Sequence, residues 1–171
     1  MIDKTRQPIV SSSHLISEQS SELSELEYGL IIANHAFQRW TVRCTNACGI
    51  SDLSPLDILI LHNVNHRDRE KKVATICFNL NIEDTHTASY SLRKLSKLGL
   101  VMSRKQGKET MFNTTKKGID LCKAYRDVRE ECLIELLGTL GTDNEKIGEI
   151  ARVLRSLSGL YDEAARAAAS L

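Results

Sequence analysis

The chain has 171 residues, of which 42% are hydrophobic and 26% are charged, so it is long and apolar enough to fold around one hydrophobic core. No apolar run approaches the roughly 18 residues that a membrane span needs, and residues 1–10 lack the apolar segment of a secretory signal, so the sequence predicts a cytoplasmic protein with no membrane partner. The formal net charge of only +1 excludes a uniformly basic chain, so any surface that binds a polyanion must be local.

A flexible tail and a long helix are predicted at the N-terminus. Residues 1–18 are polar and contain a proline and a run of three serines, which favours a flexible tail. Residues 20–48 contain no proline, and apolar side chains recur at three- and four-residue steps from Leu23 to Phe37. This spacing predicts one amphipathic helix that ends at Gly49.

Three shorter helices are predicted next, and each begins at a residue that can cap a helix. Ser54 can cap the first turn, Pro55 fits the first helical position, and Asp57 favours the positive end of a helix. These residues predict a helix over 54–66. The other two helices are expected at 69–80 with Asp68 as the cap and, after a short turn at 81–84, at 84–98 with Asp84 as the cap.

After Gly99 the pattern changes from helix to strand. Residues 100–103 and 110–113 predict two short strands, and the polar stretch 104–109 between them contains a glycine that allows a turn. A capping sequence at 114–115 then opens the next part of the chain. Two further helices, separated by glycines, are expected at 115–137 and 143–169. The predicted fold class is mainly α with a small β-hairpin wing.

Basic residues are concentrated in the middle of the chain. Residues 86–117 contain eight lysines and arginines against a single acid, Glu109. A basic segment in a nearly neutral protein indicates one surface that faces a polyanion. A solvated basic loop that binds nothing is the alternative, and a run of charge alone would favour it.

The order of three helices followed by a hairpin is that of a winged helix-turn-helix. A helix that enters the major groove of DNA needs an apolar back and a polar front, and helix 84–98 has Ala88, Leu92 and Leu95 on one side. We therefore expect it to be the recognition helix, with the wing at 104–108 on the DNA backbone or in the minor groove. The expected DNA-binding residues are His86, Thr87, Ser89 and Tyr90 towards the bases, Arg93, Lys94 and Lys97 towards phosphates, Thr85 as a further exposed donor, and Arg104, Lys105 and Lys108 in the wing.

Residues 53–121 resemble the winged helix domain of the multiple-antibiotic-resistance regulator (MarR) family. The matching landmarks are Leu-Asp-Ile-Leu at 56–59, the recognition-helix end and following strand at 91–101, and Thr-Thr-Lys-Lys-Gly at 114–118. The wing lacks that family's Asp-x-Arg-Asp-x-Arg run, and the turn at 81–84 is one residue longer. These differences place the chain in an outlying branch of the family.

The resemblance implies a homodimer, because family members pair through their N- and C-terminal helices. Two long amphipathic helices also exceed what one small domain covers alone. We expect a winged helix DNA-binding domain at 53–118, with dimerisation helices at 19–49 and 119–171, and a palindromic operator. Family regulators often bind a ligand between these parts. Tyr28, His35 and Trp40 do not share one helical face, so they cannot all line one site, and the existence and identity of a small-molecule effector stay open.

The cysteines predict neither a metal site nor a cofactor. There are five of them, Cys44, Cys48, Cys77, Cys122 and Cys132, and an odd number in a cytoplasmic chain argues against a disulfide framework. No CxxC or HxxxH pair completes a metal site, so reduced and mostly packed thiols are expected. Redox sensing would need a thiol of lowered pKa, and the only hint is Cys44 beside Arg43.

Other functions are weaker interpretations of the sequence. No motif of nucleotide-binding, zinc-protease or serine-hydrolase enzymes is present, so the chain is not expected to be an enzyme. A winged helix used only for protein–protein interaction is the main alternative, although such interfaces usually need an apolar centre. RNA binding is a third, but the basic segment lacks the interleaved aromatic residues that stack on single strands.

Overall fold

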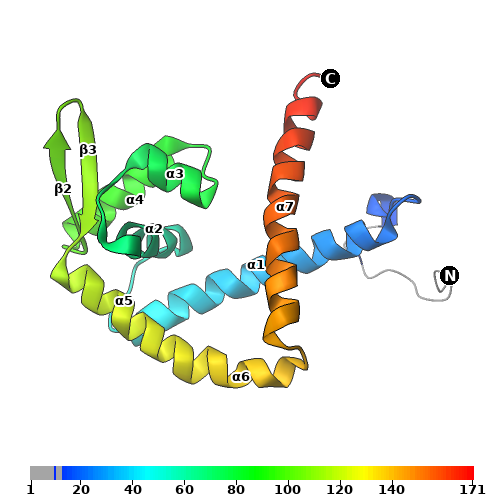
Figure 1. The fold of residues 1–171 in the computed structure, drawn as a ribbon, viewed down its shortest axis with the longest axis horizontal. Helices are drawn as coiled ribbons and strands as arrows, with labels where there is room; N and C mark the ends of the chain where they lie inside the picture. The colour runs from blue at the N-terminus through cyan, green and yellow to red at the C-terminus, as the bar shows by residue number, and fades with distance from the viewer. Residues whose placement is uncertain (1–9, 11–12) are drawn as a thin grey trace. The chain divides into compact units, whose positions relative to one another are not determined.

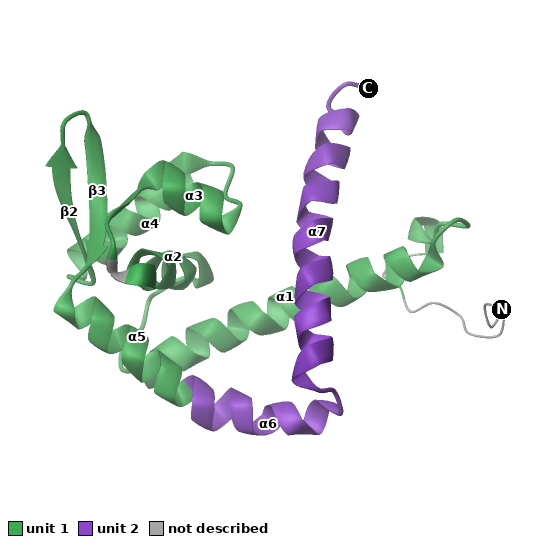
Figure 2. Cartoon of the chain, in the orientation of Figure 1, with its two compact units in different colours: residues 1–128 green, residues 129–171 purple. Residues whose placement is uncertain are grey.

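A computed structural model of the protein describes Val10 and residues 13–171, with no account of the side chain of Asp68. The chain divides into two compact units, residues 1–128 and 129–171 (Figure 2). Most of the predicted tail at 1–18 lies outside the described residues, although Ser13–Leu15 forms a short 3-10 helix. None of the helices in the described part of the chain is long and apolar enough to span a membrane.

The first unit begins with two helices that the sequence predicts closely. Helix α1 runs from Ser21 to Ala47, and Gly49 follows it with a φ of +84°. Helix α2 runs from Pro55 to Asn65 (Figure 1). It opens with a complete capping box. The Asp57 backbone N–H donates to Ser54 Oγ, and the Ser54 backbone N–H donates to Asp57 Oδ2 over 2.9 Å. The predicted cap at Ser54 is confirmed.

The helix predicted at 69–80 is shorter than expected, and its predicted start at Asp68 is wrong. A 3-10 turn at His66–Asp68 is followed by strand β1, Lys71–Lys72, and only then by helix α3, Val73–Leu80. The cause is pairing between distant parts of the chain, because the two β1 residues lie opposite Phe112 and Met111.

Helix α4, Thr85–Lys97, follows α3 after a tight turn. Asn81 ends α3 in a left-handed conformation, with a φ of +52°. The Asp84 side chain accepts a hydrogen bond from the His86 backbone N–H over 2.8 Å, so the predicted cap is confirmed. Helices α3 and α4 therefore form the expected helix-turn-helix.

The wing is a hairpin of longer strands than the sequence predicts. Strand β2 is Val101–Gln106 and strand β3 is Glu109–Thr114, so most of the polar stretch expected as a turn is paired backbone. Only two residues remain for the turn, and Gly107 takes a φ of +62° there. With β1 the sheet has three antiparallel strands in the order β1-β3-β2, rather than the two expected.

The core of this unit lies between the helices and the base of the hairpin. It is filled by apolar side chains that are at most 2% exposed, including Ile58, Ile60, Leu61, Ile76, Leu92, Leu95 and Leu100. Helix α5, Lys116–Arg129, adds Leu121, Cys122 and Tyr125 to it. This packing fixes α4 against α2 and α3, with its apolar back inside.

The second unit is a short helical turn followed by one long helix. A π-helical turn at Glu130–Ile134 leads into α6, Glu135–Leu137, and a 3-10 turn at Gly138–Leu140. Helix α7, Asn144–Ala168, then begins at Asp143, whose side chain accepts a hydrogen bond from the Lys146 backbone N–H over 2.8 Å. The predicted helices at 115–137 and 143–169 are confirmed in outline, with a π turn inside the first.

Candidate nucleic-acid interface

Helix α4, the predicted recognition helix, has a fully buried back. Ala88, Leu92 and Leu95 are 0% exposed, and Ser91 is 3% exposed. Such burial explains why this short helix forms despite its many hydroxyl residues, because packing rather than helix propensity stabilises it. The opposite side of α4 is consequently held rigidly towards solvent.

Four of the expected DNA-binding residues share one exposed face of α4. His86, Tyr90, Arg93 and Lys97 follow one another at steps of four, three and four residues, and all four are exposed. Tyr90 is 65% exposed, a large exposed fraction for an aromatic side chain. Within the described residues, the side chains of Tyr90, Arg93 and Lys97 form no hydrogen bond or ion pair. We call these four residues the recognition face.

Two hydroxyl residues on α4, Thr87 and Ser89, already donate their protons to acceptors at the start of the helix. Thr87 Oγ1 donates to Asp84 Oδ2 over 2.7 Å, and Ser89 Oγ donates to the Thr85 carbonyl over 2.8 Å. The hydrogen bonds from Thr87 and from the His86 backbone hold the pKa of Asp84 below its ordinary value. Thr87 and Ser89 thus keep lone pairs, but not free donors, for a base edge.

Lys94 points away from the recognition face. Its Nζ lies 2.8 Å from Oδ2 of Asp57, a carboxylate that is only 2% exposed. Burial raises the pKa of Asp57, but hydrogen bonds from Lys94, Ser91 and Ser54 outweigh it, so the pKa lies below the ordinary value. The sequence marks Asp57 as a helix-start residue, and gives no signal that it also binds Lys94.

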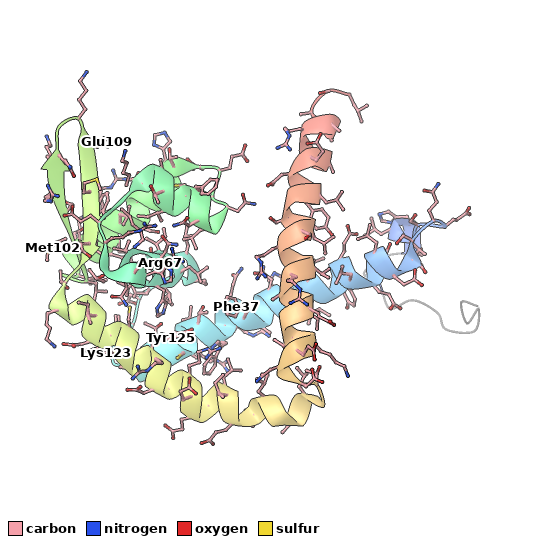
Figure 3. All side chains as sticks on the ribbon, in the orientation of Figure 1. Phe37, Arg67, Met102, Glu109, Lys123 and Tyr125 are labelled. Carbon is pink, nitrogen blue, oxygen red and sulfur yellow. The ribbon has the colours of Figure 1, made fainter. Side chains whose placement is uncertain are left out.

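The three cations of the wing also differ in whether they form an ion pair within the chain. The Arg104 guanidinium forms a two-pronged ion pair with Glu70, with hydrogen bonds of 2.7 and 2.5 Å. On strand β3, Glu109 forms an ion pair of 2.7 Å with Lys72 of strand β1, and Figure 3 labels Glu109 near the turn. Lys105 and Lys108 are exposed and form no ion pair among the described residues. The free positive charge of the wing is therefore near its tip.

Hydrogen bonds join the start of α5 to the end of α4. Thr115 Oγ1 donates to the Gly99 carbonyl over 2.6 Å, and Lys117 Nζ donates to the Leu98 carbonyl over 2.9 Å. Gly118 lies so close to the Leu100 carbonyl that a Cβ there would be 2.1 Å from its oxygen. Lys117 consequently caps the C-terminal end of α4, while remaining exposed.

Two shallow hollows lie beside α1 and α2. One, of about 310 Å³, is lined by residues that include Phe37, Thr41 and Ser54, and the other, of about 400 Å³, by residues that include His35 and Arg43. Tyr28 and Trp40 line neither of them, and Trp40 packs against the core. The aromatic residues of α1 therefore do not gather at one site.

Three of the described thiols lack the environment of a redox sensor. Burial raises the pKa of Cys48 and Cys77, and it raises the pKa of Cys122 to about 11. A thiol with a raised pKa has little reactive thiolate near neutral pH. Cys44 is 1% exposed. Among the described residues, no group of three His, Cys, Asp or Glu side chains could hold a metal ion.

Comparison with known families matches residues 53–118 to the winged helix DNA-binding domain. A search of curated proteins found no match. Among solved structures, the chain is similar to AbfR of Staphylococcus epidermidis, with a TM-score of 0.68 and 16% identity over 85% of this chain and 95% of that one. It is similar to reduced AbfR bound to DNA, with a TM-score of 0.66 and 17% identity over 85% and 99%.

A MarR transcriptional regulator from Methanosarcina mazei Go1 is also similar, with a TM-score of 0.63 and 18% identity over 80% of this chain and 96% of that one. The chain therefore contains a winged helix DNA-binding domain. Its fold as a whole is the fold of MarR family transcription regulators, which confirms the resemblance drawn from the sequence at the level of the fold.

Proposed function

We propose that the protein is a homodimeric, sequence-specific transcription regulator that places α4 in the major groove of a palindromic operator. The observation that carries this proposal is the recognition face, which stands exposed on a helix with a fully buried back inside a winged helix DNA-binding domain. One structure with the same fold has DNA bound to it. Such a regulator acts in the cytoplasm and has no enzymatic activity.

The recognition face divides into base-reading and phosphate-binding parts. His86 and Tyr90 lie near the start of α4, where recognition helices meet base edges. Thr87 and Ser89 lie beside them as acceptors, and Thr85 is exposed at the first position of the helix. Arg93 and Lys97 lie further along and bind phosphates. Lys105 and Lys108 at the wing tip contact the backbone or the minor groove. Lys94 and Arg104 are bound to acids of their own chain and take no direct part.

The dimer is supported by apolar side chains that face solvent in a single chain. On α7, Ile150, Val153 and Leu160 are 56%, 53% and 55% exposed, and on α1, Ile31 and Ile32 are 49% and 51% exposed. Exposed apolar rows on long helices usually mark an interface. A second copy of the chain would cover them and present two recognition helices to two half-sites about one turn of DNA apart.

Selection of duplexes from a random pool, followed by affinity measurements at several salt concentrations, tests DNA binding. A preferred sequence should emerge, and affinity should fall steeply with salt. Arg93→Ala should weaken binding to every duplex and reduce the slope of log affinity against log salt by about 1.8, because the dimer has two Arg93 side chains and each phosphate contact contributes about 0.9. His86→Ala or Tyr90→Ala should change the preferred sequence instead, at about 1–3 kcal/mol for the base concerned.

Two outcomes would contradict this assignment. Equal losses on every duplex for all three variants would show that His86 and Tyr90 do not read bases. If the wild-type protein bound no duplex, the regulator proposal would fall, and a winged helix that binds only protein would replace it.

Light scattering tests the dimer. At micromolar concentration we expect a particle of about twice the 19.2 kDa of one chain. Ile150→Lys should shift it towards the monomer, because a charge would be buried in the apolar row of α7. Arg155→Glu changes the charge by more, but on the polar side of the same helix, and should leave the mass unchanged. A wild-type particle of one chain's mass would rule the dimer out.

A further inference from the structure

One buried carboxylate connects the start of α2 to the back of the recognition helix. Asp57 Oδ2 accepts a hydrogen bond from the Ser54 backbone N–H over 2.9 Å and from Lys94 Nζ over 2.8 Å. The Ser91 side chain, one turn before Lys94 on α4, also hydrogen-bonds to Asp57. With 2% exposure, this carboxylate has no access to DNA.

Lys94 cannot serve both Asp57 and a phosphate. Its side chain is 32% exposed and is directed to α2, whereas the neighbouring Arg93 is exposed and has no ion-pair partner among the described residues. If Lys94 turned towards DNA, the buried carboxylate would lose its counter-charge, which is strongly unfavourable. The ion pair therefore persists when DNA binds.

We propose that Asp57 and Lys94 are positioning residues that fix the orientation of α4 on the operator. The inference rests on the proposed function. Ser91 and Lys94 reach α2 from the side of α4 that is next to the recognition face, so the pair controls how that face meets the bases. Losing the pair would let α4 rotate or shift on α2. Base contacts need fixed geometry and would weaken, but contacts of flexible side chains with phosphates would persist.

Affinities of four variants for the selected duplex and for a scrambled duplex test the proposal, over about 50 to about 200 mM salt. Lys94→Met and Asp57→Asn should each lower affinity for the selected duplex about tenfold, leave the scrambled duplex nearly unaffected and keep the salt slope. Lys94→Arg should restore wild-type behaviour. Arg93→Met is the matched control and should weaken both duplexes and reduce the slope by about 1.8, for the two Arg93 side chains of the dimer.

A Lys94→Met protein that behaves like the Arg93→Met protein would overturn the inference, since Lys94 would then be a phosphate ligand. Circular dichroism at the assay temperature shows whether each variant is folded. If Asp57→Asn does not fold, the comparison of Lys94→Met with Lys94→Arg decides alone. A wild-type protein that selects no sequence would end the regulator proposal and this inference together. If the wild-type protein selects a preferred duplex but Lys94→Met reduces the slope of log affinity against log salt, only this inference fails and the regulator proposal stands.

Discussion

Replacing Gly118 with alanine is expected to lower the free energy of unfolding of the first unit by about 3 kcal/mol. The added Cβ would lie 2.1 Å from the Leu100 carbonyl oxygen and 2.8 Å from Thr114 Cγ2. The first of these atoms belongs to the backbone between α4 and β2, so it cannot move away as a flexible side chain would. Either α5 separates from the end of the recognition helix, or the start of the wing shifts.

Urea denaturation followed by the fluorescence of Trp40, the single tryptophan, measures this loss. Gly29→Ala is the matched control. Gly29 lies inside α1, and a Cβ there meets nothing within 4 Å, so alanine should raise the free energy of unfolding by up to about 1 kcal/mol. A Gly118→Ala protein within about 0.5 kcal/mol of wild type would show that this close approach is unimportant for stability.

Replacing Lys71 with methionine is expected to cost about 3 kcal/mol. Lys71 is 2% exposed, and its ammonium donates to the carbonyls of Val64 and His66 over 2.9 and 2.5 Å and to that of Arg69 over 3.3 Å. These carbonyls lie at the end of α2 and in the turn that leads to β1. Methionine fills a similar volume but donates no hydrogen bond, so the carbonyls lose a charged partner in a buried site.

The adjacent residue provides a strict control for that experiment. Lys72 forms its ion pair with Glu109 at the surface, with side chains 48% and 52% exposed. Solvent screens such a pair, so Lys72→Met should cost about 0.5 kcal/mol or less. The two variants remove the same charge from neighbouring positions. Equal losses from both would mean that net charge, rather than the buried hydrogen bonds, determines the effect.

The helices could be predicted from the sequence because their signals are local. The caps at Ser54 and Asp84 are each followed within a few residues by the backbone N–H that they bind. Strand β1 was missed because its only signal is distant. Lys71 and Lys72 become a strand through pairing with Phe112 and Met111, and no periodicity within 69–80 indicates this.

The same distinction between local and distant signals applies to the candidate site. Spacing alone placed His86, Tyr90, Arg93 and Lys97 on the front of one helix, and their roles at DNA stay predictions. Composition could not tell which cations are already bound within the chain. The acid that binds Lys94 is 37 residues away, and the acid that binds Arg104 is 34 residues away. Such pairs are visible only after folding.

The contacts between the hairpin and β1 have a consequence for the free energy of nucleic-acid binding. Arg104 reaches across β3 to Glu70, and Lys72 binds Glu109, so both strands of the hairpin are tied to β1 or the residue before it. A hairpin already held in one direction loses less conformational entropy when its tip meets a nucleic acid. Lys105 and Lys108 thus lie on a hairpin whose direction is already fixed. In the proposed complex, less of their binding free energy would be offset by the entropy lost in ordering the hairpin.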